Sequence, residues 1–153
     1  MIEGTRPIAA GVYAPDDCEI FRAGRGGGAR LNDAPIHVSN RTVLEDSEVL
    51  GDSRVFGKDI WPIPWPRLSV HSRPSVAYRM VSVACGRADF TVALTPKRDW
   101  DVAAATLIAQ EAGAIVSDHL GNPYGFNAID SLKPSLICSG PALFPDIIKR
   151  CAH

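Results

Sequence analysis

Long apolar segments are absent from this sequence of 153 residues. The longest ones, such as Val81 to Cys85 and Val102 to Ala105, are far shorter than the roughly 18 to 20 residues that cross a bilayer. The first residues, Met1 to Arg6, also lack the basic and apolar stretches of a signal peptide. We therefore expect no membrane partner and a cytoplasmic location.

An excess of one charge is also absent. The 16 Lys and Arg residues nearly balance the 17 Asp and Glu residues, and the net charge is −1. Without a basic surface there is no electrostatic argument for binding a nucleic-acid polymer, so none is expected as a partner. Cysteine is scarce, and no two of the four residues, Cys18, Cys85, Cys138 and Cys151, form a CxxC pair. This spacing offers no zinc site and predicts reduced thiols.

The composition that remains is that of a globular chain, with 46% hydrophobic and 22% charged residues, enough to bury a core. Residues 7–14 and 19–23 are rich in β-forming side chains on either side of a Pro-Asp-Asp turn, and predict a hairpin. The stretch from Gly24 to Ile36 continues as a glycine loop and two short strands around an Asn-Asp turn. An antiparallel sheet is therefore expected in the first quarter.

The pattern loosens between residues 40 and 68. The segment from Trp61 to Pro66 contains three prolines, which exclude a regular helix and favour extended backbone. We expect an ordered loop here that divides the chain into two parts. Residues 1–66 hold the antiparallel strands and the connecting loop, and residues 67–153 form an α/β subdomain.

Strands and helices alternate in the second part. Its most secure helix covers residues 99–113, with acidic residues at its start, alanine and leucine inside, and glycine at its end. The other predicted elements are strands at 68–71, 89–94, 114–117 and 135–138 and helices at 74–86 and 141–151. Such alternation predicts a mixed or parallel sheet covered by helices, and an α+β or mixed α/β fold.

A glycine run, Gly24 to Gly28, raises the question of a phosphate-binding loop. Such a loop needs a strand before it, a helix after it and a closing Lys-Ser/Thr pair, and none of these follows. A structural turn is the favoured interpretation, and close approach of a ligand to the backbone is the alternative.

Asp99-Trp100-Asp101 is the densest chemical feature of the sequence. Two carboxylates at the first turn of a helix are explained by capping and by the positive end of the helix dipole. Alternatively, a carboxylate held at this position by a neighbouring buried aromatic residue is a rigid ligand for Mg²⁺. The residue types alone leave both interpretations open.

The region around this feature resembles the second signature of the inositol monophosphatase family, a WD-x-A-A segment followed by E-A-G. The matching residues run from Trp100 to Ala105 and from Glu111 to Gly113. Further matches occur in the order of the family: GVYAP at 11–15, EIF at 19–21, GGGA at 26–29, PIHVS at 35–39, PSVAYR at 74–79 and VACGRAD at 83–89. The resemblance covers nearly the whole chain.

The resemblance implies a Mg²⁺-dependent phosphomonoesterase that acts on a small phosphorylated substrate, a sugar or nucleotide phosphate. The family's metal-ligand role carries over to Asp101, and Trp100 would position it. The turn before the family's preceding helix lies beside the substrate, which implies substrate contacts for Ser75 and Val76. Arg98 and Trp100 complete the expected substrate-binding set.

One part of the family pattern is missing. The first signature, Asp-Pro-Ile/Leu-Asp-Gly-Thr, which supplies most metal ligands, does not occur in these residues, and neither does the upstream Glu that orients the attacking water. The chain therefore resembles only the C-terminal part of the layered αβαβα sugar-phosphatase fold, with remnant antiparallel strands followed by an α/β layer.

This departure leads to two expectations. With one carboxylate and no base, the chain alone is expected to be inactive, and no catalytic residue is assigned. A sheet without its first strands also exposes an edge, so either self-association or association with a missing N-terminal half is expected. The alternative function is that of a non-catalytic truncated homologue, a binding or oligomerisation module.

Overall fold

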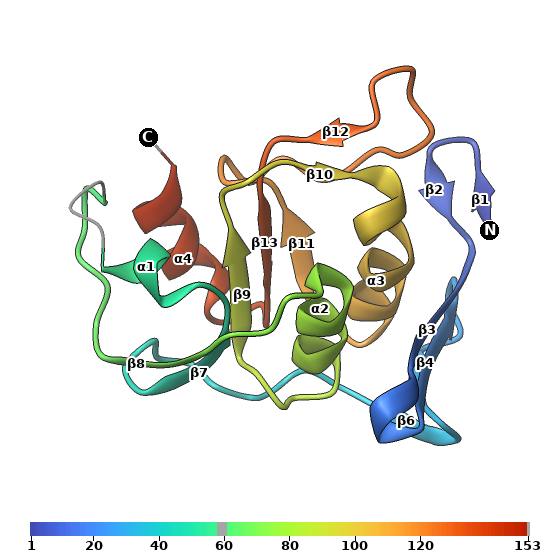
Figure 1. The fold of residues 1–153 in the computed structure, drawn as a ribbon, viewed down its shortest axis with the longest axis horizontal. Helices are drawn as coiled ribbons and strands as arrows, with labels where there is room; N and C mark the ends of the chain where they lie inside the picture. Colours follow the sequence, from blue (N-terminus) through green and yellow to red (C-terminus); the bar gives the residue numbers. More distant parts are fainter. Residues whose placement is uncertain (58–60, 153) are drawn as a thin grey trace.

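The computed structural model describes residues 1–57 and 61–152. The chain is arranged in four layers, which follow one another across Figure 1: helices, a mixed sheet, two more helices and an antiparallel sheet. This is an αβαβ arrangement, one helical layer short of the αβαβα fold that the sequence resembles.

The antiparallel sheet is built by the first 36 residues. Its strands follow one another in chain order: β3 (Ala9–Ala14), β4 (Glu19–Gly24), β5 (Ala29–Leu31) and β6 (Ala34–Ile36). A short 3-10 helix, η1 (Pro15–Asp17), joins the first two, and Asn32 turns the last two with a φ of 53°. A two-stranded hairpin, β1 (Ile2–Glu3) and β2 (Arg6–Pro7), precedes β3. The expected antiparallel sheet is confirmed.

The mixed sheet has five strands in the order β11-β13-β9-β7-β8. Their bounds are Ile115–Ser117, Leu136–Ser139, Phe90–Ala93, Ser47–Leu50 and Leu68–His71. Strand β7 is parallel to both β8 and β9, whereas β13 is antiparallel to its two neighbours. The predicted mixed sheet covered by helices is therefore present.

Helices cover both faces of the mixed sheet. The layer between the two sheets consists of α2 (Val76–Ala84) and α3 (Asp99–Glu111), and the outer layer of α1 (Ser53–Phe56) and α4 (Phe144–Cys151) (Figure 1). The main core lies around α2 and α3, where side chains such as Phe21, Met80 and Ile108 are fully buried. A second core lies under α4 and contains Phe90 stacked on Trp65 at 5.7 Å.

The expectation of a loop between residues 40 and 68 is wrong in part, because this stretch contains a strand and a helix. Strand β7 and helix α1 both fall inside that stretch, and β7 is an inner strand of the mixed sheet. Its pairing with β9 joins Val49 to Phe90, a contact between distant parts of the sequence that local patterns do not reveal. The division at residues 66 and 67 remains a prediction, although β7 belongs to the same sheet as later strands.

Other expectations about the chain can be compared directly. Cys18, Cys85, Cys138 and Cys151 are all free thiols. Among the described residues, no helix combines the length and apolar character that crossing a bilayer requires.

Candidate functional site

Helix α2 presents its N-terminus near the candidate substrate residues. Ser75 is the N-cap, and its hydroxyl accepts a hydrogen bond from the Tyr78 backbone at 3.2 Å. Val76 is the first helical residue and is partly buried against the main core. Because the first amides of a helix have no partner within it, this end of α2 is suited to an anion.

Helix α3 starts with the Asp-Trp-Asp feature. The Asp101 carboxylate accepts a hydrogen bond from the Arg98 backbone amide at 2.8 Å, as a capping residue does. The capping interpretation is therefore realised in the structure. The second carboxylate oxygen of Asp101 is the one that a metal ion would use.

Asp99, which shared the capping interpretation with Asp101, is the more buried of the two carboxylates. It forms an ion pair with Lys133 at 2.7 Å and accepts a hydrogen bond from the Asn127 backbone at 2.8 Å. Both partners belong to the loop before β13, where β12 (Leu132–Lys133) pairs with β10 (Lys97–Arg98). On the buried side of α3, Asp99 thus attaches the start of the helix to the loop before β13.

Trp100 corrects one expectation. It is 75% exposed, so Asp101 is not held in place by a buried aromatic side chain. The Arg98 guanidinium lies 5.9 Å from the centre of the Trp100 ring, and both side chains are at the surface. Trp100 instead borders a cavity of about 490 Å³ between α3 and the edge of the antiparallel sheet, lined by Met1, Ile2, Pro7, Ala9, Ala10, Gly11, Trp100, Ala103 and Ala104.

Lys97 interacts electrostatically with both Asp101 and Arg79. Burial lowers the pKa of Lys97, the neighbouring Arg79 lowers it further, and Asp101 opposes both effects. Burial also lowers the pKa of Arg79, against the attraction of Asp52. Arg79 belongs to the first turns of α2, whereas Lys97 directly precedes α3. The electrostatic interaction of Lys97 with Arg79 brings together one positive charge from each side of the space between the two helices, and positive charge favours an anionic ligand.

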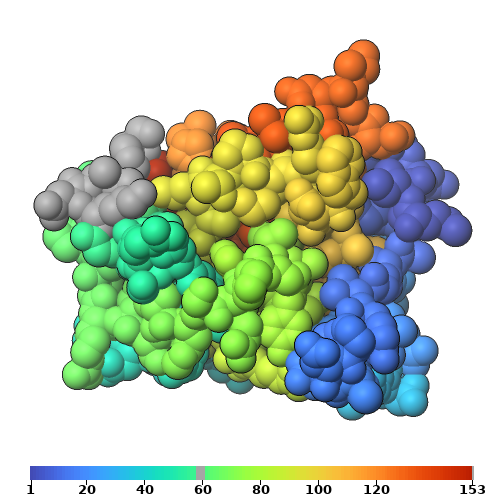
Figure 2. All heavy atoms as spheres, in the orientation of Figure 1, coloured from blue at the N-terminus to red at the C-terminus, as the bar shows by residue number. Residues whose placement is uncertain are grey.

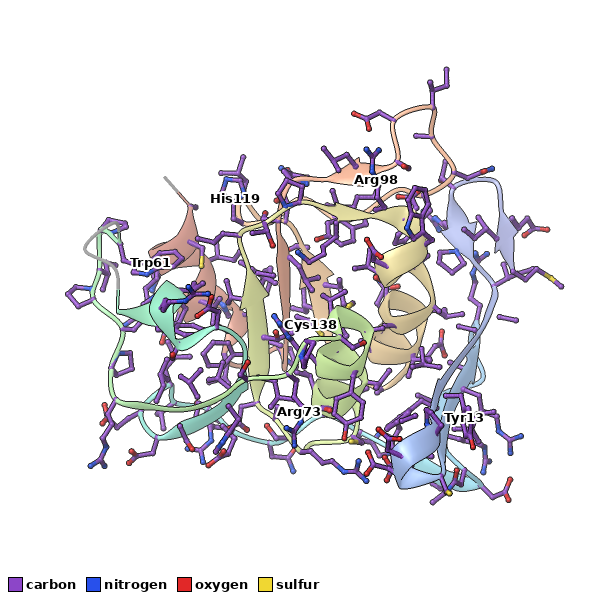
Figure 3. All side chains as sticks on the ribbon, viewed as in Figure 1. Tyr13, Trp61, Arg73, Arg98, His119 and Cys138 are labelled. Atoms are coloured by element: carbon purple, nitrogen blue, oxygen red, sulfur yellow. The ribbon has the colours of Figure 1, made fainter. Side chains whose placement is uncertain are left out.

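Ser75 borders a different cavity, also of about 490 Å³, on the side of α2 that faces η1. The Tyr78 hydroxyl donates to the Asp17 carboxylate at 3.2 Å across it. Figure 3 shows Arg73 and Tyr13, two of its lining residues, at the end of the molecule opposite Arg98. The structure thus groups Arg98, Trp100 and Asp101 at one helix start, and it places Ser75 in a separate cavity.

The residues present do not by themselves fit Mg²⁺. Among the residues described, there is no group of three or more His, Cys, Asp or Glu side chains that could hold a metal ion. Mg²⁺ needs nearly octahedral oxygen ligands, and Asp101 offers one carboxylate oxygen that does not accept the Arg98 amide, with the cation Lys97 nearby. A metal site here requires further carboxylates from outside the described set.

The glycine run has a structural partner. The two carboxylate oxygens of Glu111 accept hydrogen bonds from the Gly26 and Gly28 amides, each at 2.9 Å. Both glycines have positive φ, 73° and 74°, as the turn requires. The turn is therefore bound to the end of α3, in agreement with the structural interpretation.

Four layers of alternating helix and sheet define a member of the layered sugar-phosphatase class. The chain matches the description "Inositol monophosphatase family" over residues 1–151, and it belongs to this family.

Individual relatives support the assignment. The Dictyostelium discoideum inositol monophosphatase is 30% identical over 154 residues, a match that covers 93% of this chain and 54% of that protein. The Nus factor SuhB of Xylella fastidiosa is 33% identical over 131 residues, covering 79% and 46% respectively. The structure of a Thermotoga maritima IMPase matches with a TM-score of 0.78 and 27% identity, over 97% of this chain and 57% of that chain. The chain therefore spans about half the length of the curated relatives it matches.

Proposed function

We propose that this chain forms one half of a phosphomonoesterase of the inositol monophosphatase family and is inactive without a complementary acidic segment. The observation that carries the proposal is the start of α3. Asp101 there interacts electrostatically with Lys97, and the described residues supply no group of three or more carboxylate, His or Cys side chains that could hold a metal ion. The four free cysteines are consistent with work in the reducing cytoplasm.

In this proposal each residue has a limited task. Lys97, Arg79 and the first amides of α2 attract the phosphate of a sugar or nucleotide phosphate, and the exposed Arg98 is available to a second phosphate. When bound, Mg²⁺ would supply a polarised water and stabilise the leaving oxygen. Asp101 is the residue of this chain that would contribute to holding it, together with carboxylates of the complementary segment.

The proposal is tested by phosphate release from inositol 1-phosphate and 3′-phosphoadenosine 5′-phosphate while Mg²⁺ is titrated. The chain alone should show no Mg²⁺-dependent turnover. Turnover should appear when the part of the Dictyostelium relative outside the matched region is added as a separate polypeptide. It should then be lost in Asp101→Asn, whereas the control Asp146→Asn, on the exposed surface of α4, should retain it.

Two results would contradict the proposal. Mg²⁺-dependent turnover by the chain alone would mean that an acidic cluster assembles from residues not recognised here. A folded mixture that binds phosphate esters but never hydrolyses them would favour the alternative, a non-catalytic binding or oligomerisation module.

A further inference from the structure

The cavity of about 490 Å³ between η1 and the start of α2 contains none of the side chains at the start of α3. One of its walls is formed by residues 12–17, and the other by residues 73–75 together with Tyr78. Figure 2 shows both walls on one face of the molecule, the η1 segment in blue and the start of α2 in green. Sites for small molecules are concave and have volumes of about 300 to 1,000 Å³, so this cavity has the size of a ligand site.

Both walls are held in place by hydrogen bonds. The Cys18 amide donates to the Pro15 carbonyl at 3.1 Å and closes η1. The Ser75 hydroxyl accepts from the Tyr78 amide at the start of α2. The Tyr78 hydroxyl in turn donates to the Asp17 carboxylate at 3.2 Å and joins the two walls. A ligand therefore meets walls that are already arranged, which lowers the entropic cost of binding.

The two walls carry opposite charges. Asp16 and Asp17 line the cavity from η1, whereas Arg73 lines it from the segment before α2, and all three side chains are exposed. Within the described part of the chain, no ion pair of 4.0 Å or less joins Arg73 to either carboxylate. One cavity thus presents an anionic wall and a cationic wall that do not neutralise each other.

The surfaces between these charges are apolar and aromatic. Val12, Pro15 and Pro74 line the cavity together with the rings of Tyr13 and Tyr78. Tyr13 is 62% exposed, so its ring is accessible from solvent. An aromatic ring packs against an apolar body, and its face also attracts a cation. The cavity is therefore complementary to a molecule that has an apolar body and one charge of each sign.

We infer that this cavity binds a small zwitterionic molecule. Its ammonium group lies at Asp16 and Asp17, its carboxylate at Arg73, and its apolar body against the two tyrosine rings. A guanidinium matches a carboxylate with two parallel hydrogen bonds, which an ammonium group cannot use. A molecule with a single charge is attracted by one wall only. Neither Mg²⁺ nor turnover enters this inference, so it stands or falls independently of the proposed function.

The test uses ω-amino acids from glycine to 6-aminohexanoate, in which the distance between the two charges increases with each carbon. They are titrated into the full chain at pH 7, and the ring resonances of Tyr13 and Tyr78 are followed by NMR. One length should bind most tightly. At that length the zwitterion should bind about fivefold or more tightly than the carboxylate or the amine with the same number of carbons.

Variants test the two walls separately. Arg73→Gln should remove the advantage of the zwitterion over the amine, and Asp16→Asn combined with Asp17→Asn should remove its advantage over the carboxylate. The controls Arg6→Gln and Asp146→Asn change exposed charges outside the cavity and should leave binding unchanged. Circular dichroism verifies the fold of each variant. If the double variant unfolds, Asp16→Asn alone decides, because it leaves the hydrogen bond between the walls intact.

Three results would overturn the inference. The first is that none of the ω-amino acids shifts the tyrosine resonances at about 10 mM, a concentration that detects even weak binding. The second is that the carboxylate or the amine alone binds as tightly as the zwitterion, which would define a site for one charge only. The third is that Arg73→Gln binds the zwitterion as tightly as the unmodified chain, because the molecule is then bound elsewhere.

Discussion

Glu111 shows how one side chain links distant parts of this molecule. Its carboxylate accepts hydrogen bonds from Gly26 and Gly28, more than 80 residues earlier in the sequence. The two glycines adopt a backbone conformation that other residues rarely do, so their amides converge on one point. This convergence of amides serves the fold, because a residue of the chain supplies the anion.

Replacing Glu111 should therefore weaken the fold. Glu111→Ala removes the acceptor of two amides and is expected to lower the free energy of unfolding by about 1 to 3 kcal/mol. Glu111→Gln should lie between this value and the unmodified chain, because one acceptor oxygen remains. Urea denaturation measures both, and the exposed neighbour variant Gln110→Ala is the control. Equal stability of Glu111→Ala and Gln110→Ala would show that the contact contributes nothing.

At the scale of elements, the start of α3 depends on the loop before β13. Lys133 and Asp99 are both about nine-tenths buried and lie 2.7 Å apart. A buried charge without its partner is costly, whereas an exposed pair such as Asp146 and Lys149 contributes little. The buried pair attaches the loop and its strand β12 to the helix.

Lys133→Met is expected to destabilise the chain by about 3 to 5 kcal/mol, because Asp99 stays buried and charged. Lys149→Met should change stability by less than about 0.5 kcal/mol. Thermal and urea unfolding provide the comparison. The double variant Asp99→Asn with Lys133→Met should recover part of the loss, and a double variant as unstable as Lys133→Met would argue against charge as the cause.

Local signals in the sequence predicted most elements but not all of them. Helix α3 has acidic residues at its start and glycine after its end, and the strands near Pro15 and Asn32 are separated by turn residues. Strand β7 has no such signal, since its place comes from pairing with β9. The exposure of Trp100 was also beyond sequence reasoning, because it depends on what covers the edge of another sheet.

The candidate site was predicted in part for similar reasons. The Asp-Trp-Asp feature located the start of α3, and the resemblance located the start of α2. The proximity of Lys97 to Arg79 depends on how the two helices pack, which no spacing in the sequence encodes. The contact of Tyr78 with Asp17 likewise joins residues from the two layers.

At the scale of the whole molecule, the described residues of the four layers supply only part of a metal site. Asp101 interacts electrostatically with Lys97, and the antiparallel sheet leaves its outer face uncovered (Figure 1). Figure 2 shows the N-terminal segments packed directly beside the α3 region, at the edge of the molecule.

Mg²⁺ should not stabilise the isolated chain. A ligand that binds only the folded state raises the melting temperature, and one carboxylate with the cation Lys97 nearby provides too little affinity for this. Differential scanning fluorimetry should give the same melting temperature in millimolar Mg²⁺ and in EDTA. A Mg²⁺-dependent rise that Asp101→Asn removes would instead reveal a complete metal site in this chain.

The pairing of β7 with β9 also constrains the order of events during synthesis. The antiparallel sheet needs only the first 36 residues, and β7 can find β8 soon after both have left the ribosome. The centre of the mixed sheet cannot form before β9, which contains Phe90, has been synthesised. Strand β13, the antiparallel partner of β9, is synthesised later still. The nascent chain therefore carries β7 with one side unpaired until β9 has been synthesised, and the centre of the mixed sheet is complete only after β13 has followed.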